Sequence, residues 1–317
     1  MRSVTLLLCI LMTTTISEGA DRSTGKMFAT RSEVIAENGM VATSHALATQ
    51  VGLDILKEGG TAVDAAIAAN AALGLMEPMS NGIGGDLFAI VWDPKTKRLH
   101  GLNASGRSPR SLTRQAFERQ GISKEIPYMG KFSLSVPGCV DGWFELHEKF
   151  GRLPMSKILE PTIRYARDGH PVPEIIADSW DRSVRNRSKQ TELMPGFMET
   201  FSREGTAPRK GDIWKNPALA DTLSLVARKG RDAYYEGSIA QTMDAYLKKI
   251  DAYLSYEDLA AHKSEWVQPV SASYRGWELW ELPPNGQGIA ALQMLNILEG
   301  FDLQSAGFGS REHLHFL

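Results

Sequence analysis

The run of residues 65–73 constrains the fold more than any other part of this sequence, because it is apolar on nearly every side. It lies within a predicted helix over residues 62–76 that is rich in alanine. A helix that is hydrophobic all round is buried, and small side chains let it pack closely against a sheet. The sequence therefore predicts a layered fold with this helix inside it.

A glycine-rich segment follows this helix directly. Residues 76–86 read Met-Glu-Pro-Met-Ser-Asn-Gly-Ile-Gly-Gly-Asp, with three glycines in four positions. Such a segment turns where a side chain would clash, or comes close to another group. Two strands are predicted next, over residues 87–93 and 98–103, and the first is a continuous apolar run typical of a buried strand. A glycine loop between a buried helix and a buried hairpin predicts the floor of a site.

The remaining patterns predict more helices than strands. A helix over residues 45–57, capped by Ser44, precedes the alanine-rich helix. Further helices are expected over residues 140–150, 156–167, 174–189, 217–229, 239–248, 289–298 and from 310 onward, and strands over 132–136 and on both sides of the turn at 274–276. Early strands, a helical middle and late strands favour one α+β body whose sheet is completed by distant segments.

The first twenty residues differ from the rest and predict an exported protein. Arg2 precedes a short apolar run over residues 4–12, and small residues follow up to Ala20. This order is that of a secretory signal peptide over residues 1–20, and the apolar run is far shorter than the ~20 residues that span a bilayer. We expect a secreted or periplasmic protein with no stable membrane span. Cleavage would leave Cys139 as the one cysteine, without an internal disulfide.

Composition and motif spacing argue against several function classes. The formal net charge is −2, so no basic surplus points to nucleic acid as a partner. The histidines show no metal-ligand spacing except His313 and His315, which cannot share one helical face. The glycine loop follows a helix and precedes a strand, the reverse of the dinucleotide-binding order, and no P-loop motif occurs. Neither a metal site nor a cofactor site is predicted.

Two side chains could carry chemistry. Cys139 could be imagined as a nucleophile, but the nearest histidine in sequence, His147, lies eight residues further along a predicted helix. A catalytic thiol needs a base, so a buried packing thiol is favoured. Arg107 sits among small residues after a predicted strand, where its planar fork could clamp a carboxylate. A solvated loop arginine beside Arg110 explains the same pattern, and composition leaves both interpretations open.

A series of short motifs runs in order from residue 39 to residue 300. They are Gly-Met-Val-Ala (39–42), Ser-His-Ala-Leu-Ala (44–48), Glu-Gly-Gly-Thr-Ala-Val-Asp-Ala-Ala (58–66), Glu-Pro (77–78), Ser-Asn-Gly-Ile-Gly-Gly (80–85), Ser-Val-Pro-Gly (135–138), Gly-Arg-Leu-Pro (151–154), Tyr-Arg-Gly (274–276), Pro-Pro (283–284) and Leu-Gln-Met-Leu-Asn-Ile-Leu-Glu-Gly (292–300). In these motifs the chain resembles the γ-glutamyltransferases, also called glutathione hydrolases. We expect residues 21–317 to form the large-subunit region of that family.

The resemblance implies a fold and a reaction. The fold is that of an N-terminal-nucleophile hydrolase, an αββα sandwich of which this chain would form only the large-subunit portion. The family's precursor, a zymogen, cuts itself before a threonine that then attacks the γ-glutamyl amide of substrates such as glutathione, with its own α-amine as base. Backbone donors stabilise the oxyanion, and the acyl group passes to water or to an acceptor amine. The resemblance implies no metal and no cofactor.

Two departures from the family pattern shape the expected site. The nucleophilic threonine is expected beyond Leu317, so this chain would hold no catalytic residue and would be inactive without the missing small subunit. The family's glutamyl-binding arginine falls two positions before Arg107, where this chain has Ser105. Arg107 is therefore the predicted substrate-binding residue, as the nearest counterpart.

Three interpretations stay open at the level of sequence. Arg107 together with Asn-Gly-Gln-Gly at residues 285–288 is similar to a γ-glutamyltransferase-like branch of the family. An acylase acting on a different amide fits the same departures. A truncated, non-catalytic remnant or a subunit that only binds a partner is the third possibility.

Overall fold

The computed structural model describes residues 32–317. The chain divides into a first unit that ends at Met40 and a large unit, Val41–Leu317, to which the helices and strands of the described residues belong. The predicted signal peptide, residues 1–20, lies outside the described residues. Within the described part, none of the helices combines the length and the apolar character needed to cross a membrane.

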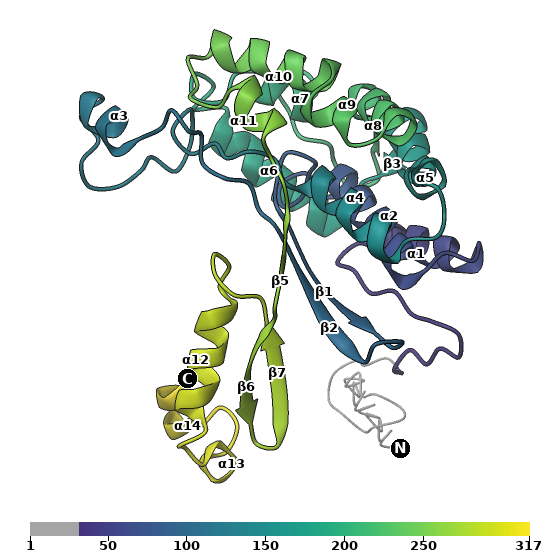
Figure 1. Ribbon diagram of the computed structural model, residues 1–317, viewed down its shortest axis with the longest axis vertical. Coiled ribbons are helices and arrows are strands. Elements are labelled where there is room, and N and C mark those ends of the chain that lie inside the picture. Colours follow the sequence, from purple (N-terminus) through teal and green to yellow (C-terminus); the bar gives the residue numbers. More distant parts are fainter. Residues whose placement is uncertain (1–31) are drawn as a thin grey trace, which may run out of the picture. The chain divides into compact units, whose positions relative to one another are not determined.

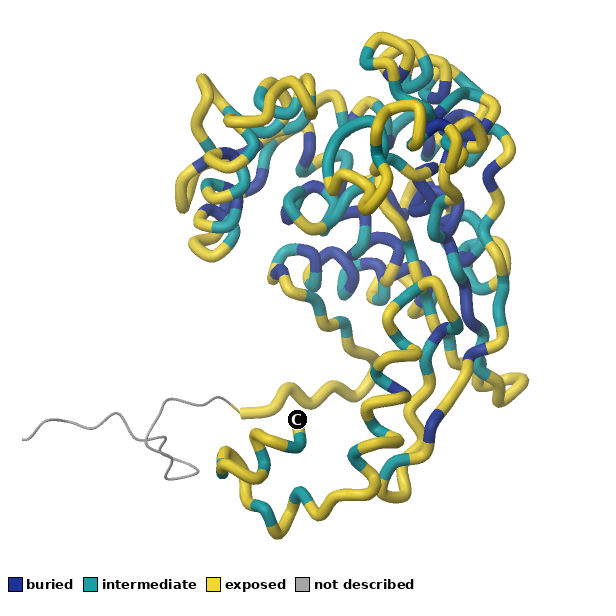
Figure 2. Tube along the Cα trace, turned by 90° about the vertical axis from the view of Figure 1, so that its left-hand side faces the viewer, coloured by how far each residue is buried: buried dark blue, intermediate teal, exposed yellow. Residues whose placement is uncertain are grey.

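The alanine-rich helix lies in the core, as predicted. α2 (Ala62–Met76) begins at a capping box, in which the hydroxyl of Thr61 accepts the N–H of Asp64 and the Asp64 carboxylate accepts the N–H of Thr61. Ala68 and Ala72 have no exposed surface, because neighbouring helices pack on several sides of α2. Figure 2 shows this helical part as the region where buried residues gather.

The first helix differs from its prediction at its cap. α1 (Ala46–Lys57) is capped by His45, whose Nδ1 accepts the N–H of Leu47. Ser44, the predicted cap, instead donates its hydroxyl to Glu77 Oε2 at 2.8 Å. The hydroxyl is therefore engaged in a tertiary contact with the segment after α2, which no local pattern reveals.

Most predicted helices are confirmed within two residues at each end. The helical part comprises α1, α2, α3 (Arg114–Arg119), α4 (Cys139–Phe150), α5 (Met155–Asp168), α6 (Glu174–Arg187), α7 (Phe197–Phe201), α8 (Pro217–Lys229), α9 (Asp232–Tyr235), α10 (Ser238–Lys249) and α11 (Tyr256–Ala260). The sequence did not predict α3, α7, α9 and α11, because helices of four to six residues are too short to show a 3.6-residue period.

A three-stranded antiparallel sheet lies against these helices. β1 (Leu87–Asp93) pairs with β2 (Arg98–Ala104), and β2 pairs with β5 (Glu265–Val267), which comes from far along the chain. Gly142 lets α4 pack closely on this sheet, because a Cβ there would lie 2.7 Å from the Cβ of Ala104. Figure 1 shows β5 leading from the helices toward the C-terminal segments.

The prediction that β1 is a buried strand is wrong for one of its faces. Leu87, Ala89 and Val91 pack toward the helices, whereas Phe88, Ile90 and Trp92 alternate with them and are 44%, 39% and 56% exposed. The helices cover one side of the sheet, and no second layer within residues 32–317 covers the other. An apolar run of this kind is typical of a strand that is covered on both faces. The described residues supply the cover on one face only.

The predicted late hairpin is confirmed. β6 (Val270–Tyr274) pairs with β7 (Trp277–Glu281) across a two-residue turn, Arg275 and Gly276, both with positive φ. That combination is the turn whose twist suits an antiparallel hairpin. α12 (Gly288–Leu298) packs on this hairpin, and α13 (Leu303–Ala306) and α14 (Arg311–Phe316) follow it.

A predicted strand over residues 132–136 is wrong. Its alternating side chains suit a strand, but the segment joins no sheet, and its Val136 N–H donates to the carbonyl of Arg107 at 3.0 Å. The remaining two strands, β3 (His170–Pro171) and β4 (Ile213–Trp214), form a small separate pair.

Candidate functional site

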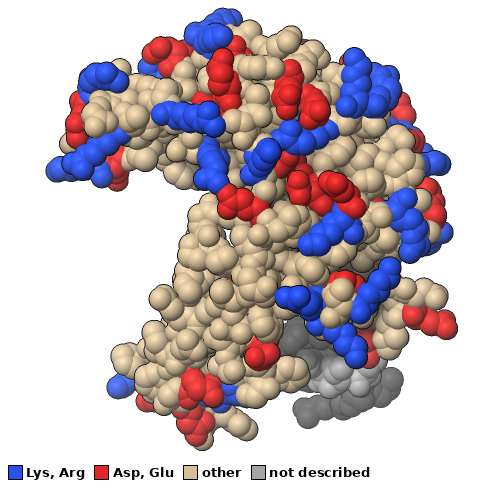
Figure 3. Space-filling view, in the orientation of Figure 1, with Lys and Arg blue, Asp and Glu red and all other residues tan. Residues whose placement is uncertain are grey.

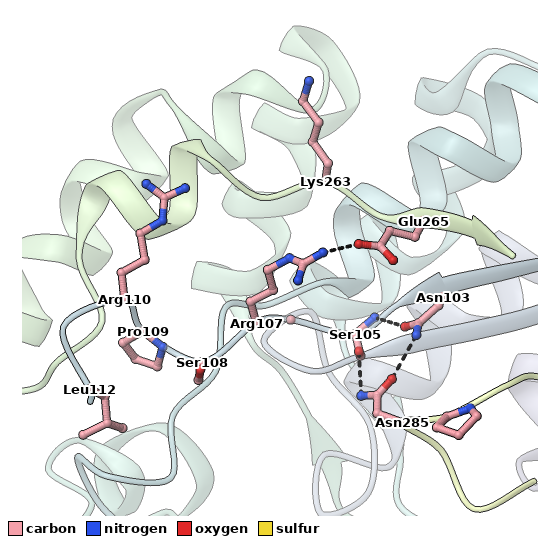
Figure 4. A pocket seen from close by; sticks show the side chains of 12 residues that line it. Asn103, Ser105, Arg107, Ser108, Pro109, Arg110, Leu112, Lys263, Glu265 and Asn285 are labelled. Atoms are coloured by element: carbon pink, nitrogen blue, oxygen red, sulfur yellow. Dashed lines mark hydrogen bonds and ion pairs between the residues drawn. The ribbon is translucent and has the colours of Figure 1, made fainter. Parts of the chain in front are cut away.

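A polar cavity of about 620 Å³ opens beside the turn that follows β2. Three stretches distant in sequence build it: the turn after β2, the start of β5 and the loop after β7 (Figure 4). Its lining residues are Asn103, Ser105, Gly106, Arg107, Ser108, Pro109, Arg110, Leu112, Lys263, Glu265, Pro284 and Asn285. This volume is within the range of small-molecule sites.

The turn over residues 105–109 is held by hydrogen bonds from its N–H groups to side chains, and it leaves no room for a side chain at Gly106. The N–H of Gly106 donates to Asp86 Oδ1 at 3.1 Å, and the N–H of Ser105 donates to Asn103 Oδ1 at 3.0 Å. A Cβ on Gly106 would lie only 1.4 Å from the carbonyl oxygen of Val136. Glycine at this position is therefore what lets the two segments cross.

The predicted glycine loop, which ends at Asp86, contacts the same turn and the start of α4. The carbonyl of Gly85 accepts the N–H groups of Gly138 and Cys139 at the start of α4, at 3.0 and 2.9 Å. Gly138 in turn lies so close to β2 that a Cβ would be 1.9 Å from the carbonyl oxygen of Ala104. The loop thus joins the helical layer to the end of β2, where the cavity begins.

Arg107, the predicted substrate-binding residue, lines this cavity and pairs with Glu265 of β5. The guanidinium group reaches across the cavity to the carboxylate, as Figure 4 shows. The two side chains are 75% and 56% exposed, so solvent screens the ion pair and it contributes little to folding stability. An incoming carboxylate can compete with Glu265 for this guanidinium group.

Asn285 closes the opposite wall through neutral hydrogen bonds. Its Oδ1 accepts from Asn103 Nδ2 at 2.9 Å, and its Nδ2 donates to Ser105 Oγ at 2.9 Å. The motif at residues 285–288 indicates a family resemblance but does not by itself place Asn285 in the site. Glu265 lies in no motif and was not predicted, because its partner is 158 residues away.

The cavity favours an anionic ligand. Three cationic side chains, Arg107, Arg110 and Lys263, line it against one carboxylate, Glu265. The amide groups of Asn103 and Asn285 are already engaged with each other and with Ser105. The cationic groups therefore remain as the principal attraction for a ligand, and a carboxylate is the group that a guanidinium fork fits best.

A buried ionic network holds the start of β5 at the cavity. Asp141 of α4 is 1% exposed and accepts from Arg231 Nε and from both the N–H and the hydroxyl of Ser264. Burial lowers the pKa of neighbouring His262, although Asp141 opposes that shift. Because Ser264 lies between Lys263 and Glu265, this anchor fixes two side chains of the cavity wall.

Cys139 is a packing thiol, as predicted. It is 4% exposed, its Sγ donates to Asn70 Oδ1 at 3.4 Å, and burial raises its pKa to about 12. His147, the nearest histidine in sequence, has its Nε2 2.6 Å from the carbonyl oxygen of Leu153. A thiol with so high a pKa supplies no thiolate near neutral pH. Nor do residues 32–317 contain a group of three or more side chains placed to hold a metal ion.

Comparison with known proteins identifies relatives along most of the chain. The family model described as Gamma-glutamyltranspeptidase matches residues 48–317. The Glutathione hydrolase-like YwrD proenzyme of Bacillus subtilis is 40% identical over 288 residues, covering 90% of this chain and 53% of that protein. The Glutathione hydrolase proenzyme of Escherichia coli is 34% identical, covering 90% of this chain and 49% of that protein.

Solved structures share the fold. The cephalosporin acylase from Bacillus halodurans matches with a TM-score of 0.85 and 43% identity, over 91% of this chain and 54% of that one. The Helicobacter pylori gamma-glutamyltranspeptidase matches with a TM-score of 0.81 and 28% identity, over 90% of this chain and 81% of that one.

The layered arrangement and these structural matches define the class, the N-terminal-nucleophile hydrolases with an αββα sandwich, of which this chain forms a portion. Within that class, the chain belongs to the γ-glutamyltranspeptidase family, whose curated members are enzymes and include proenzymes. The predicted family and fold class are thereby confirmed. The chain spans about half the length of the curated relatives that it matches.

Proposed function

We propose that this chain is the large-subunit part of a γ-glutamyltransferase-like enzyme that cleaves γ-glutamyl amides such as glutathione. The observation that carries the proposal is the cavity with Arg107 in its wall, whose lining side chains have a net positive charge. A γ-glutamyl group presents an α-carboxylate, and the Arg107 guanidinium group would bind it in place of Glu265. Family membership supplies the reaction class.

The nucleophile in this proposal comes from a segment outside residues 1–317. The hydroxyl of its N-terminal threonine attacks the amide carbon, and its α-amine takes the hydroxyl proton and passes it to the departing amine. Water then hydrolyses the γ-glutamyl ester, or an acceptor amine takes the acyl group. The described residues would contribute binding and orientation of the glutamyl group, so the chain alone would be inactive.

Exposed apolar surface supports the need for a second subunit. Besides the outer face of β1, Trp277 is 80% exposed, and Met294 and Ile297 of α12 are 56% and 64% exposed. Figure 3 shows charged side chains over the helices and few on the visible face of the segments after β5. Apolar patches of this kind mark surfaces that a partner covers. In this proposal residues 21–317 are the large-subunit region and the small subunit is the partner.

Export belongs to the same proposal. The charged start, short apolar run and small residues at residues 1–20 support a cleaved signal peptide and a secreted or periplasmic location. Sequencing the N-terminus of the mature protein tests it: a start at or next to residue 21 is expected. A mature protein that retains Met1 would contradict it.

An acylase acting on another amide is the second candidate function. The cephalosporin acylase of Bacillus halodurans is similar over 91% of this chain, and an Acylase ACY 1 proenzyme of Pseudomonas is 33% identical. The observation that favours this candidate is Ser105, which bonds to Asn285 where the family's arginine would stand.

One assay separates the two candidates. The complete enzyme, with its nucleophile-bearing segment, is given γ-glutamyl-p-nitroanilide with and without an acceptor dipeptide, and in parallel a cephalosporin side-chain amide. Preferred turnover of the γ-glutamyl compound supports the first proposal. Preference for the cephalosporin amide would replace it with the second, and turnover by residues 1–317 alone would contradict the placement of the nucleophile.

A further inference from the structure

A second cavity, of about 790 Å³, lies apart from the polar one and shares no lining residue with it. It forms between the start of α1, the residue that follows α2, and the segment from β3 into α6. Its lining includes Ser44, His45, Glu77 and Glu174 as polar residues, and the rest of it is mainly apolar. The reaction proposed above uses none of them.

Glu77 gives this cavity a buried carboxylate with one oxygen uncommitted. The residue is 7% exposed. Ser44 Oγ and Asn81 Nδ2 both donate to Oε2, at 2.8 and 3.3 Å. Within residues 32–317, no group donates a hydrogen bond to Oε1. This oxygen keeps some contact with solvent. Since Glu77 lines the cavity and donors occupy Oε2, we infer that Oε1 faces the cavity.

His45 adds no positive charge beside this carboxylate. Its Nδ1 accepts the N–H of Leu47 at 3.2 Å, so the neutral ring carries its proton on Nε2. Burial lowers the pKa of His45 by more than the nearby charge of Glu77 raises it. The second lining carboxylate, Glu174, is exposed and paired with Lys210 at 2.7 Å. The interior of the cavity therefore holds a net negative charge.

The rest of the wall is apolar. Leu47, Val172, Ile175 and Ile176 surround the opening together with two prolines. Ile175 is 79% exposed, so its side chain is free to contact a ligand. An apolar wall with a few polar groups inside is the general form of a small-molecule site.

We propose that this cavity binds an organic ammonium compound with a branched apolar body. The ammonium group donates to Glu77 Oε1, and the apolar body lies against Val172 and Ile176. A carboxylate ligand would meet a buried like charge, and a purely apolar one would leave the carboxylate oxygen without a partner. An amine satisfies both parts of the cavity.

The test uses 3-methylbutylamine as the probe and 3-methylbutanol as its uncharged match, with the full chain. Isothermal titration calorimetry or saturation-transfer NMR measures both affinities near neutral pH. The amine is expected to bind at least tenfold more tightly than the alcohol, which is ~1.4 kcal/mol. Equal affinities, or no binding of the amine, would overturn the proposal.

Two variants locate the binding site. Glu77→Gln keeps an oxygen for Ser44 and Asn81 and turns an NH₂ group toward the cavity, so amine affinity should fall about tenfold while alcohol affinity stays. Ala46→Phe should abolish binding of both probes, because Ala46 is an exposed lining residue at the start of α1.

Ala218→Phe is the matched control, since Ala218 is likewise exposed in the first turn of a helix but lies outside the cavity. Its affinities should equal those of the unchanged chain. If Glu77→Gln fails to fold, the comparison of probe affinities between Ala46→Phe and Ala218→Phe tests the proposal by itself. Amine binding that survives Ala46→Phe would place the amine elsewhere and overturn the proposal.

Discussion

At the scale of single residues, the proposed function rests on a competition between two carboxylates for Arg107. Glu265 holds the guanidinium group in an exposed pair that is easily exchanged, so the carboxylate of a ligand would replace the carboxylate of the protein. Neither residue alone suggests this role. The small residues around Arg107 left its role open, and the family resemblance made it the predicted binding residue, whereas Glu265 becomes recognisable only once β5 lies beside β2.

Removing the competitor should strengthen substrate binding. In the complete enzyme, Glu265→Gln is expected to lower KM for γ-glutamyl-p-nitroanilide about threefold with kcat unchanged, because a carboxylate that occupies Arg107 is gone and uniform binding affects KM alone. Steady-state kinetics measures this. Glu278→Gln on β7 is a control on an exposed carboxylate outside the cavity. A KM that rises in Glu265→Gln would show that Glu265 helps to bind the substrate.

A buried histidine should make stability depend on pH. His170 has no exposed surface, and burial lowers its pKa from 6.5 to about 4. Below pH 6.5 the unfolded chain binds a proton at this residue and the folded chain does not. The contribution of His170 to the free energy of unfolding is therefore complete above pH 6.5 and is lost as the pH falls toward 4. Between pH 7 and pH 5 the loss from this group is about 2 kcal/mol.

Urea denaturation at both pH values measures that loss. His170→Gln removes the titrating group, so its difference in unfolding free energy between pH 7 and pH 5 should be smaller than that of the unchanged chain by about 2 kcal/mol. An identical difference in the two proteins would mean that His170 accepts its proton without cost in the folded state.

At the scale of elements, the glycine-dependent crossing at residue 106 links the fold to the cavity. Gly106→Ala places a Cβ against the Val136 carbonyl, so the turn must shift, at a cost of ~1–3 kcal/mol. The control is Gly286→Ala, next to Asn285 of the opposite wall, where a Cβ meets nothing within 4 Å. Thermal unfolding and KM together test the point. A Gly106→Ala variant as stable as the control, with unchanged KM, would mean that the turn is free to move.

Local patterns predicted those elements whose bounds or turns are set by neighbouring residues in the sequence. The alanine-rich apolar run predicted α2, and the turn at Arg275 and Gly276 predicted the late hairpin. The segment over residues 132–136 alternates as a strand does, yet it lies beside Arg107 without joining a sheet, because pairing depends on a neighbour that sequence does not name. The same holds for Asn285 and Ser105, which meet across 180 residues.

At the scale of the whole molecule, one face of β1 carries apolar side chains that no described part of this chain covers. Phe88, Ile90 and Trp92 form an apolar row opposite the helical layer. In an αββα sandwich that face meets a second sheet, and the matched relatives are about twice as long as this chain. We therefore expect the row to be covered in the assembled enzyme.

A charge in this row should prevent assembly without unfolding the helical part. Ile90→Lys is expected to abolish co-purification with the nucleophile-bearing segment, because a lysine would be buried unpaired between two sheets. Far-ultraviolet circular dichroism checks that the helices persist. Leu193→Lys, at a 51% exposed position in a loop, serves as the control. Normal assembly of Ile90→Lys would show that the row stays open to solvent.

In the proposed function, Arg107 binds the carboxylate of a γ-glutamyl substrate in an enzyme completed by a second subunit. The most direct test is KM for γ-glutamyl-p-nitroanilide in the assembled enzyme with Arg107→Ala, with Arg107→Lys beside it. We expect a KM at least tenfold higher for Arg107→Ala, which is ~1.4 kcal/mol of lost binding, and an intermediate KM for Arg107→Lys. A KM unchanged in Arg107→Ala would contradict it.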